Sequence, residues 1–533
     1  MPLNYGDILD AVAPIRADQF AISSDTGDLT WREFDARTNA LARGLLEKGL
    51  KEGDKVCFLM LNGAPYVELL AACLKARLIH VNANFRYLSH EIEYILENSD
   101  SSALVYDARL AERVDAISSD TKATTLLVET GDEAPTIDGA IEFEALMNNQ
   151  PTTPLGIERS PDDLIFLYTG GTTGKPKGVM WPHSQQLMGL LGSAIEGKSA
   201  PATVEELIAH IDDPKPYLTP LIATPLMHGA GLYTALTTLC NGGHIVVTDN
   251  GKAFDAAHHW RLVERHHVDA VSIVGDTFAK PLATELERGD YDVSSVRIVG
   301  SSGVLWSTPV KKQFLEYMPD AAMYDALGSS EAMGLGTSIM TAGGVSESAT
   351  FKIGPQAKVF KEDGTEVLPG SGEAGFLARS GPMPLGYYKD EEKTAETFRM
   401  IGGVRYAVPG DMCTVDTSGT IHLLGRGSHC INTGGEKVYP NEVEEAIKMH
   451  DAMEDALVFG TPDPKWGSAV QAVASIPGGL SVGPEDLRAF LRNSLAGYKI
   501  PKRIVFTDQS LRMANGKPDY ALARAIFENA AQS

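Results

Sequence analysis

The sequence predicts an α/β protein with a large first domain of doubly wound sheets and a smaller α+β domain at its end. At 533 residues the chain is too long for one hydrophobic core. Strand-like and helix-like patterns alternate over its first 300 residues, which is typical of parallel sheets covered by helices. From about residue 353, short apolar runs alternate with Gly, Pro and Asp turns, which predicts a small β-rich subdomain.

The first elements follow directly from the residue pattern. A helix is expected over 30–50, where Thr30 and Glu33 form a capping pair before apolar residues at helical spacing. The next expected elements are a strand over 55–61, a helix over 66–76 and a strand over 102–106. The alternation then returns in apolar runs over 164–167, 221–223, 243–248, 270–274 and 296–300, with a helix from Thr277.

The last part of the chain has a mixed pattern that predicts a separate domain. Helices are expected over 441–449 and 484–496. We therefore divide the chain into 1–426, which contains the β-rich subdomain 353–426, and 427–533. The segment 195–220 is rich in Pro, Lys and Asp and is interpreted as an exposed insertion.

Composition narrows the class of protein. Hydrophobic residues at 43% and charged residues at 22% are typical of a soluble globular chain, and the net charge of −24 argues against nucleic acid or an anionic membrane as the main partner. No apolar stretch reaches the roughly 18–20 residues of a membrane span, so we expect no integral membrane protein. Five scattered cysteines without a CxxC pair are expected to be reduced thiols of a cytoplasmic protein.

The most informative stretch is Leu-Tyr-Thr-Gly-Gly-Thr-Thr-Gly-Lys-Pro-Lys-Gly-Val at 167–179, directly after an apolar strand pattern. Glycines let backbone N–H groups approach an anion, hydroxyls donate to phosphate oxygens and lysines add positive charge. The stretch therefore predicts a phosphate-binding loop, and a solvated turn is the alternative. Its candidate ligands are Thr169, Gly170, Gly171, Thr172, Thr173, Gly174, Lys175 and Lys177.

Two other patterns are set aside. A literal Walker A match at 192–199 follows a helical run, 184–194, and precedes Pro201, whereas that motif needs a strand before it and a helix after it. Histidines cluster around Glu264 and could suggest a metal site. They fall on a charged helix pattern, so we interpret them as an exposed face; they are His258, His259, His266 and His267.

The loop at 167–179 resembles the phosphate loop of the acyl-adenylate-forming (ANL) superfamily. That superfamily contains acyl-CoA synthetases, peptide-synthetase adenylation domains and firefly-type luciferases. Segments similar to its other motifs follow in the family order along the chain. The resemblance implies an ATP-dependent enzyme that uses Mg²⁺, and it implies a role for each matching residue.

Three segments resemble the part of the family site that holds acid and adenine. The segment 224–231 implies that His228, Gly229, Ala230 and Gly231 line the substrate pocket, where the small residues leave room for a bulky acid. No carboxylate lies at 226–232 to pair with an amino group, so an amino-acid substrate is not expected. The segment 300–304 implies that Ser302 and Gly303 lie against adenine.

The segment 326–331 resembles the next family motif. It places Leu327 and Gly328 at the substrate, Ser330 at the nucleotide and Glu331 on Mg²⁺ together with Thr172. Leu327 stands where the family has an aromatic residue, and this weakens the expected stacking on adenine.

The remaining matches concern the nucleotide sugar, CoA and catalysis. Asp411 matches the residue that accepts hydrogen bonds from the ribose hydroxyls, and Arg426 matches the arginine just before the hinge, here Ser428. Asn515-Gly-Lys517-Pro-Asp519 resembles the catalytic lysine motif. The segments expected on the CoA side contribute Gly434, Gly435, Lys437 and Trp466.

Together the resemblance implies a carboxylate–CoA ligase that forms acyl-AMP with release of pyrophosphate and then transfers the acyl group to CoA. A mobile domain, 427–533, would deliver Lys517 first and the CoA channel later. The context of Val179-Met-Trp181 is similar to bacterial acyl-CoA synthetases of fatty or steroid side-chain acids. The alternatives are an aryl-CoA ligase, an adenylating enzyme that loads a carrier protein, and a nucleotide-sensing module. The oligomeric state stays open, with a homodimer among the options.

Overall fold

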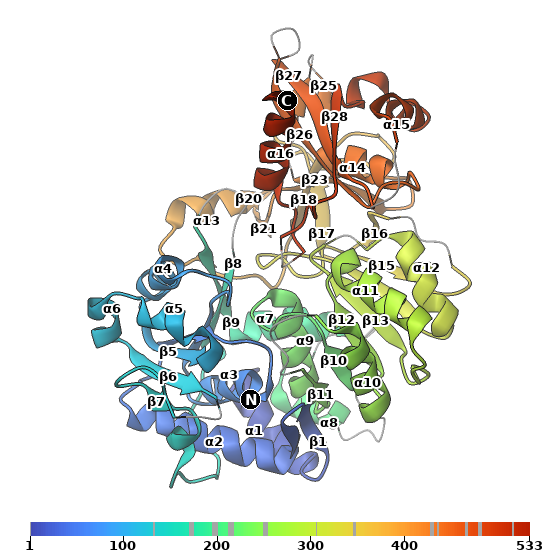
Figure 1. Ribbon diagram of the computed structural model, residues 1–533. Coiled ribbons are helices and arrows are strands. Elements are labelled where there is room, and N and C mark those ends of the chain that lie inside the picture. The colour runs from blue at the N-terminus through green and yellow to red at the C-terminus, as the bar shows by residue number, and fades with distance from the viewer. Residues whose placement is uncertain are drawn as a thin grey trace. The chain divides into compact units, whose positions relative to one another are not determined.

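The chain folds into two compact units, shown in the computed structural model of Figure 1. The first unit comprises Met1–Gly334, Ser338–Ser346 and Ser380–Arg399, and the second comprises Leu335–Thr337, Glu347–Arg379 and Met400–Ser533. The structure describes residues 2–131, 134–169, 175–194, 201–211, 218–248, 254–304, 306–344, 348–426, 431–433, 436–463, 467–477, 482–513 and 516–532.

One sheet of the first unit has the strand order β4-β3-β5-β6-β7, and every neighbouring pair is parallel. Its strands are β3 (Lys55–Leu59), β4 (Ile79–Asn82), β5 (Ser101–Asp107), β6 (Leu126–Thr130) and β7 (Ile141–Glu142). The helices of this part of the chain are α1 (Tyr5–Ile15), α2 (Trp31–Glu47), α3 (Ala64–Lys75), α4 (Ser89–Ser99), α5 (Ala111–Asp115) and α6 (Ser119–Thr124). The capping pair expected for α2 is confirmed, because Thr30 and Glu33 each accept a hydrogen bond from the other's backbone N–H.

The second sheet of this unit has the order β2-β1-β11-β10-β12-β13-β14 and is parallel except for the edge strand β2. Its strands are β1 (Phe20–Ser24), β2 (Gly27–Thr30), β10 (Pro220–Ile222), β11 (Ile245–Val246), β12 (Ala270–Ile273), β13 (Ile298–Ser302) and β14 (Ala322–Leu327). Its helices are α9 (Gly229–Cys240), α10 (Ala256–His266), α11 (Gly275–Arg288) and α12 (Thr308–Tyr317). The predicted α/β class with doubly wound sheets is confirmed.

A third, antiparallel sheet with the order β19-β9-β8 was not expected as a whole. Strand β8 (Leu164–Thr169) matches the predicted apolar run, but the pairing strands β9 (Lys177–Pro182) and β19 (Gly386–Tyr387) were missed. Helices α7 (His183–Ala194) and α13 (Glu391–Thr397) follow β9 and β19. The hairpin of β8 and β9 presents the predicted phosphate loop between two fixed ends.

The second unit begins with antiparallel strands, as the pattern of short apolar runs and turns after residue 353 predicts. They are β15 (Gly336–Met340), which passes into the first unit, β16 (Thr350–Ile353), β17 (Ala357–Phe360), β18 (Gly375–Arg379), β20 (Phe398–Ile401), β21 (Val404–Ala407), β22 (Asp411–Val415) and β23 (Thr420–Arg426).

The unit ends in an α+β part, whose strand β27 pairs with both β26 and β28. Its strands are β24 (Ile431–Thr433), β25 (Glu436–Val438), β26 (Asp455–Asp463), β27 (Gly467–Ser475) and β28 (Arg503–Thr507), and its helices are α14 (Pro440–Lys448), α15 (Pro484–Leu491) and α16 (Tyr520–Gln532). Residues on both sides of 427 belong to the second unit, and the boundary predicted there stays a prediction.

Two expectations need correction. The segment 195–220 was interpreted as an exposed insertion, but it contains helix α8 (Val204–Ile211), whose apolar residues Val204, Leu207 and Ile211 are buried. The histidines of α10 were interpreted as an exposed face, but His259 is only 5% exposed and stacks on Phe254. Both predictions were based on the polar and charged residues of the segment. They did not take into account that each helix also has an apolar face, which is buried.

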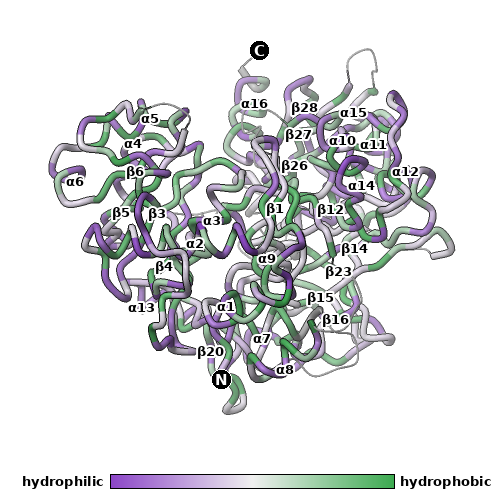
Figure 2. The backbone as a smooth tube through the Cα atoms, turned by 90° about the horizontal axis from the view of Figure 1, so that it is seen from below, coloured by the Kyte–Doolittle hydropathy of each residue, from purple (hydrophilic) through white to green (hydrophobic). Residues whose placement is uncertain are grey.

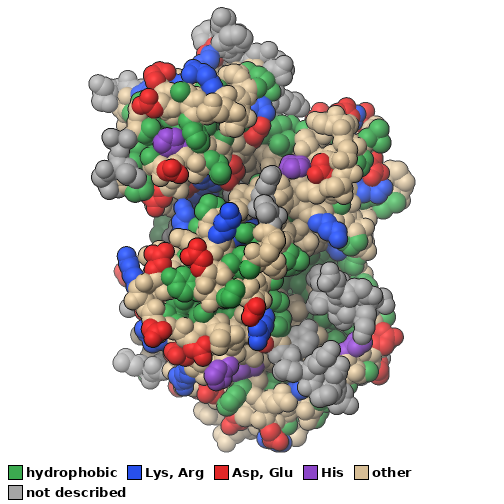
Figure 3. Space-filling view, turned by 90° about the vertical axis from the view of Figure 1, so that its right-hand side faces the viewer, with side chains coloured by type: hydrophobic (Ala, Val, Ile, Leu, Met, Phe, Trp, Pro, Cys, Tyr) green, Lys and Arg blue, Asp and Glu red, His purple; other side chains and the backbone are tan. Residues whose placement is uncertain are grey.

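Hydrophobic and hydrophilic stretches alternate over short distances along the chain, as expected for elements with one buried face (Figure 2). Acidic and basic side chains lie interspersed on the face seen in Figure 3. Among the described residues, no helix combines the length and apolar composition that crossing a bilayer requires. The described cysteines Cys57, Cys73, Cys240 and Cys413 are free and buried.

Candidate functional site

Most of the predicted site residues of the first unit follow the carboxyl ends of parallel strands in one sheet. Strands β10, β12, β13 and β14 are neighbours in this order and run in the same direction. In such a sheet the segments after the strands meet at one edge, where α/β proteins bind ligands. The predicted residues that follow or end these strands are His228, Ser302, Gly303, Leu327, Gly328, Ser330 and Glu331.

The turn that contains Ser330 and Glu331 is held by two aromatic side chains from the β8–β9–β19 sheet. The Tyr387 hydroxyl donates a hydrogen bond of 2.7 Å to Glu331 Oε1, and the Trp181 Nε1–H donates one of 2.8 Å to the Ser330 carbonyl. Both aromatic side chains are buried, and Tyr387 pairs in register with Val179 of β9. The Glu331 carboxylate is thereby oriented at the sheet edge. No motif or residue spacing in the sequence indicated that Tyr387 would contact Glu331.

The base of the predicted phosphate loop is tied to the segment before His228 by one buried asparagine. Asn82, at the end of β4, accepts a hydrogen bond of 2.6 Å from the Tyr168 N–H. Its amide group donates bonds of 2.8 Å to the carbonyls of Tyr168 and Met227. These two carbonyls directly precede Thr169 and His228, so Asn82 fixes two predicted parts of the site relative to each other.

Asn62 makes a matching set of contacts with the same segment. Its Oδ1 accepts a bond of 2.7 Å from the Leu226 N–H, and its Nδ2 donates one of 2.9 Å to the Thr224 carbonyl. Sequence reasoning missed both asparagines, because their partners lie more than 80 residues away along the chain.

The two described ends of the phosphate loop carry Thr169 on β8 and Lys177 on β9, and residues 170–174 lie outside the described residues. Lys177 forms an ion pair with Asp390, which also caps the N-terminus of α13. The hydrogen bond from Lys177 lowers the pKa of the Asp390 carboxyl. Lys175 lies over the ring of Tyr94, with 4.5 Å between its Nζ and the ring centroid.

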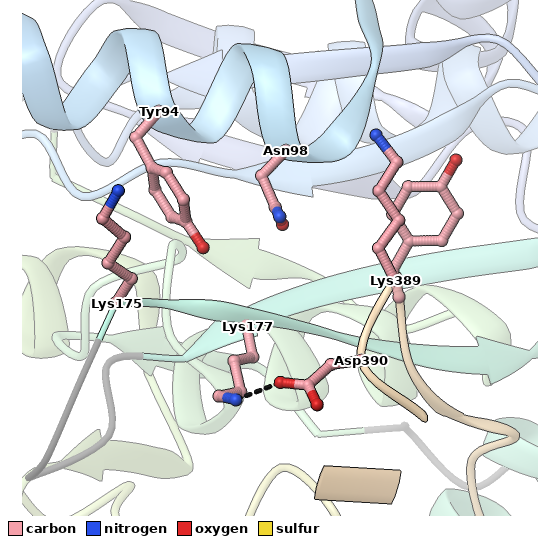
Figure 4. A pocket seen from close by; sticks show the side chains of 7 residues that line it. Tyr94, Asn98, Lys175, Lys177, Lys389 and Asp390 are labelled. Atoms are coloured by element: carbon pink, nitrogen blue, oxygen red, sulfur yellow. Dashed lines mark hydrogen bonds and ion pairs between the residues drawn. The ribbon is translucent and has the colours of Figure 1, made fainter. Parts of the chain in front are cut away.

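These loop-end lysines line a cavity of about 310 Å³ (Figure 4). Its other lining residues are Tyr94, Asn98, Tyr388, Lys389 and Asp390. Three lysines against one carboxylate give this cavity a positive lining, which suits the oxygens of a phosphate chain. Lys389 in turn pairs with Asp100, at 2.7 Å.

The segment predicted to line the acyl pocket is described in full. His228 is half-buried and stands at the N-cap position of α9. A Cβ on Gly231 would lie 2.5 Å from the Pro225 carbonyl oxygen, so the close approach of the backbone accounts for this glycine. It therefore provides no room for an acid, unlike the expectation. Ala230, which is half-buried like His228, is the better position at which to change the size of a pocket.

The nearby Tyr233 lies at the same end of α9. A Cβ on Gly229 would be 3.3 Å from its ring. Burial, with a smaller contribution from the negative charge of Glu331, raises the pKa of the Tyr233 hydroxyl. Gly303 has φ +84°, which favours glycine, so its identity follows from the backbone of the turn.

In the second unit the structure brings two predicted residues together. Asp411 and Arg426 are register partners in the antiparallel pair of β22 and β23. Lys517 is exposed in the short segment between β28 and α16. Lys437 lies in β25. The predicted residues that fall outside the described ones are Gly170, Gly171, Thr172, Thr173, Gly174, Ser428, Gly434, Gly435 and Trp466.

A magnesium ion fits the donor chemistry at Glu331. Its carboxylate supplies a hard oxygen ligand, already oriented by the Tyr387 hydroxyl. Among the described residues no group of three or more His, Cys, Asp or Glu side chains could hold a metal. Mg²⁺ is usually bound by one or two carboxylates together with substrate phosphates.

The chain belongs to the AMP-binding enzyme family. The profile of that family matches residues 9–388, and the profile of the AMP-binding enzyme C-terminal domain matches residues 442–517. The second match ends on Lys517. The resemblance to acyl-adenylate-forming enzymes is thereby confirmed.

Two relatives match along nearly the whole chain. It is 37% identical over 538 residues to a 3-oxocholest-4-en-26-oate–CoA ligase of Rhodococcus rhodochrous, covering 98% of this chain and 96% of that protein. It is 39% identical over 532 residues to a medium/long-chain-fatty-acid–CoA/3-oxocholest-4-en-26-oate–CoA ligase of Mycobacterium tuberculosis, covering 99% and 96%.

The fold is also found in a solved structure. ATP-bound MatB from Rhodopseudomonas palustris superposes with a TM-score of 0.80 at 23% identity, covering 98% of this chain and 99% of that one. At this identity the likeness shows the fold alone.

Proposed function

We propose that this protein is an AMP-forming acid–thiol ligase that activates an apolar medium- or long-chain, branched or steroid side-chain acid. The observation that carries the proposal is the gathering of His228, Ser330 and Glu331 at the carboxyl edge of one parallel sheet, beside the loop-bearing hairpin. Identity of 37–39% to the two CoA ligases supports the substrate class. An aryl-CoA ligase and a carrier-loading enzyme are not favoured.

In the first half-reaction a carboxylate oxygen of the acid attacks the α-phosphorus of ATP, and the bond to the β-phosphate breaks to release pyrophosphate. Catalysis of this step is mostly positioning and charge neutralisation. The hydroxyls and N–H groups of the loop at 169–174, with Lys177, would hold the phosphates. Lys517 would balance the charge that develops on the transferring phosphate.

The other predicted contacts hold the nucleotide and the acid. Asp411 would accept hydrogen bonds from both ribose hydroxyls, since an ionised carboxylate is an acceptor only. Ser302 and Gly303 would lie against adenine, and the His228 segment against the acid. Glu331 and Thr172 would hold Mg²⁺, which supplies positive charge to the phosphates when it is bound.

In the second half-reaction the CoA thiolate attacks the acyl carbonyl, and AMP leaves. Gly434, Gly435, Lys437 and Trp466 would border the CoA channel, and Ser428 would act as the hinge between the two arrangements. The division at 426/427 is part of this proposal. The cytoplasm is the compartment that we propose, because the described cysteines are buried thiols. A homodimer is the assembly to test first.

The proposal is tested by measuring pyrophosphate release with acetate, medium-chain, long-chain, aryl and steroid side-chain acids, each with and without CoA. We expect release to require the acid and to increase with its apolar size, since each buried CH₂ contributes about 0.8 kcal/mol. We expect CoA to convert the acyl-AMP into thioester and AMP. Best activity with acetate would overturn the substrate class. Acyl-AMP that persists when CoA is added would overturn the ligase.

A further inference from the structure

Lys517 lies in a short hairpin whose own hydrogen bonds keep it closed. The Met513 N–H donates to the Lys517 carbonyl at 2.9 Å, and the Asp519 N–H donates to the Leu511 carbonyl at 3.0 Å. Arg512 and Pro518 form an antiparallel bridge between these two bonds. Gly516, with φ +79°, turns the chain just before the lysine. Residues 511–513 and 516–519, the described part of the hairpin, therefore form a defined antiparallel pair in which Lys517 is exposed.

One end of this hairpin is attached to the core through a half-buried ion pair. Arg512 donates to both carboxylate oxygens of Asp455, the first residue of β26, at 2.5 and 2.6 Å. The two side chains are only 20% and 15% exposed. A bidentate arginine–carboxylate pair fixes both the orientation of the guanidinium group and its distance from the carboxylate. A single contact from an ammonium group fixes only the distance.

The other end is attached through a half-buried phenol. The Tyr520 hydroxyl, at the start of α16, donates a hydrogen bond of 2.8 Å to Glu444 Oε1 on α14. The same oxygen accepts a bond of 2.9 Å from the Val458 N–H of β26. Glu444 is 4% exposed, so this contact is shielded from water.

We propose that Arg512 and Tyr520 are positioning residues that clamp both ends of the Lys517 hairpin onto Asp455 and Glu444, and so present Lys517 for acyl-AMP formation. The proposal rests on the proposed role of Lys517. It goes beyond that role, because it assigns the precise placement of the lysine to two residues that touch neither substrate nor phosphate. A clamp that is largely shielded from water suits this task, since a misplacement of about 1 Å can cost roughly 100-fold in rate.

The test compares the two half-reactions in the full-length protein. In Arg512→Gln and Tyr520→Phe we expect acyl-AMP formation to fall about 10–100-fold. Thioester formation from supplied acyl-AMP and CoA should stay within about twofold of wild type, because that step does not use Lys517. Arg512→Lys keeps the charge but loses the two-pronged contact, so its rate should lie between those of wild type and Arg512→Gln.

Arg488 provides a matched structural control in the same unit. It donates to the carbonyls of Pro501 and Lys502, at 3.1 and 2.7 Å, far from the hairpin in sequence. A merely structural role of Arg512 would make Arg512→Gln behave like Arg488→Gln, with equal losses in both half-reactions. That result, or no loss in either half-reaction, would overturn the proposal.

A second measurement does not depend on activity. Hydrogen exchange of the peptide that spans 511–519 should accelerate in Arg512→Gln and Tyr520→Phe but not in Arg488→Gln, because a hairpin that has lost an attachment opens its Met513 and Asp519 hydrogen bonds more often. Unchanged exchange would contradict the clamp. Lys517→Ala separates the two ideas. If Lys517→Ala abolishes acyl-AMP formation while the clamp variants do not impair it, the clamp fails and the function stands. If Lys517→Ala leaves acyl-AMP formation intact, the role of Lys517 fails.

Discussion

The sheet edge of the first unit and the hairpin of the second unit hold their functional side chains in opposite ways. At the sheet edge, Glu331 and the His228 segment follow strand ends and are tied by short hydrogen bonds from Tyr387 and Asn82. In the hairpin, Lys517 stands exposed, and side chains at the two ends of its segment attach it to the core of the unit. A rigid edge suits contacts to the adenylate and to the acyl group, which the proposed mechanism needs in both half-reactions. An exposed lysine on a clamped hairpin suits a contact that is needed in one of them.

The largest expected effect separates these two regions directly. Lys517→Ala should lower acyl-AMP formation about 10²–10³-fold, because one preorganised charge at the transferring phosphate can stabilise the transition state by several kcal/mol. Thioester formation from supplied acyl-AMP should persist. The two half-reactions are followed by pyrophosphate release and by CoA-dependent loss of acyl-AMP, with Lys502→Ala as a control in the same unit. Equal losses in both would remove the contrast between the regions.

Asp411→Ala tests a residue of the second unit. Like the residues at the sheet edge of the first unit, Asp411 is expected to bind the nucleotide. Loss of the acceptor for two ribose hydroxyls costs roughly 1–3 kcal/mol, so we expect the KM for ATP to rise by about 5–100-fold. Asp416→Ala, which changes a carboxylate that bonds within its own exposed turn, is the control. An ATP KM that stays at the wild-type value would exclude Asp411 from the nucleotide site.

Asn82→Ala tests whether the rigid edge depends on its buried ties. The change leaves the Tyr168 N–H and the Tyr168 and Met227 carbonyls without their present partner, at a cost of about 1–3 kcal/mol. We expect a melting temperature lower by roughly 2–8 °C. We also expect a loss of kcat/KM for ATP and acid together, because Asn82 fixes both the loop base and the His228 segment.

Asn84→Ala, two residues away, is the matched control for Asn82→Ala, since the Asn84 side chain accepts a hydrogen bond from the N–H of the nearby Arg86. Loss of stability with unchanged kcat/KM in Asn82→Ala would show that the tie serves folding alone.

The sequence predicted the strands and the motif residues of the molecule, but it did not predict the side-chain contacts that hold those residues in place. The alternation of apolar runs with helical patterns was sufficient for the parallel sheets, because strands buried on both faces form short continuous apolar runs that can be recognised locally. The site residues after β10, β13 and β14 were found through motif resemblance. The ties from Asn82, Tyr387 and Arg512 were missed, because each joins segments far apart in the chain.

The corrected glycine illustrates the same limit. Gly231 was expected to leave room for the acid, but the Pro225 carbonyl occupies the direction of its missing side chain. Small size in a motif has two possible causes, space for a ligand and close approach of backbone, and only the fold distinguishes them. His259 was assigned to an exposed face for a similar reason, because its burial depends on Phe254 and the rest of the core rather than on its neighbours in the chain.

The smallest expected effect concerns buried carboxyls, which both units contain. Burial raises the pKa of Glu444 in the second unit to about 7 and that of Asp325, beside Lys311 in the first unit, to about 6. A raised pKa means that the folded protein binds the proton more tightly than the unfolded chain does. The stability that this adds is fully present below the unfolded pKa and is lost as the pH rises through the folded pKa. Both groups therefore reduce the free energy of unfolding between about pH 4 and pH 7.

Glu444→Gln isolates the contribution of the second unit from that of Asp325. Glutamine cannot ionise, but its Oε1 can still accept the hydrogen bonds from Tyr520 and Val458. The positive groups that face Glu444 are Lys448 and Arg512, and their attraction for its carboxylate only partly offsets burial. We expect the variant to melt at about the wild-type temperature at pH 5 and roughly 2–8 °C higher at pH 8.

The same variant also tests whether the placement of the Lys517 hairpin depends on the charge of Glu444. Because Glu444→Gln keeps the acceptor for Tyr520, acyl-AMP formation should stay near the wild-type rate while the pH dependence of melting becomes flatter. Glu445→Gln, on the same helix and paired with Lys448, should leave that pH dependence unchanged. If Glu444→Gln melts at a lower temperature than wild type at pH 8, the interactions of the ionised carboxylate stabilise the folded protein by more than burial of its charge destabilises it. The hairpin would then be held by charge at both ends, rather than by an ion pair at Arg512 and a hydrogen bond at Tyr520.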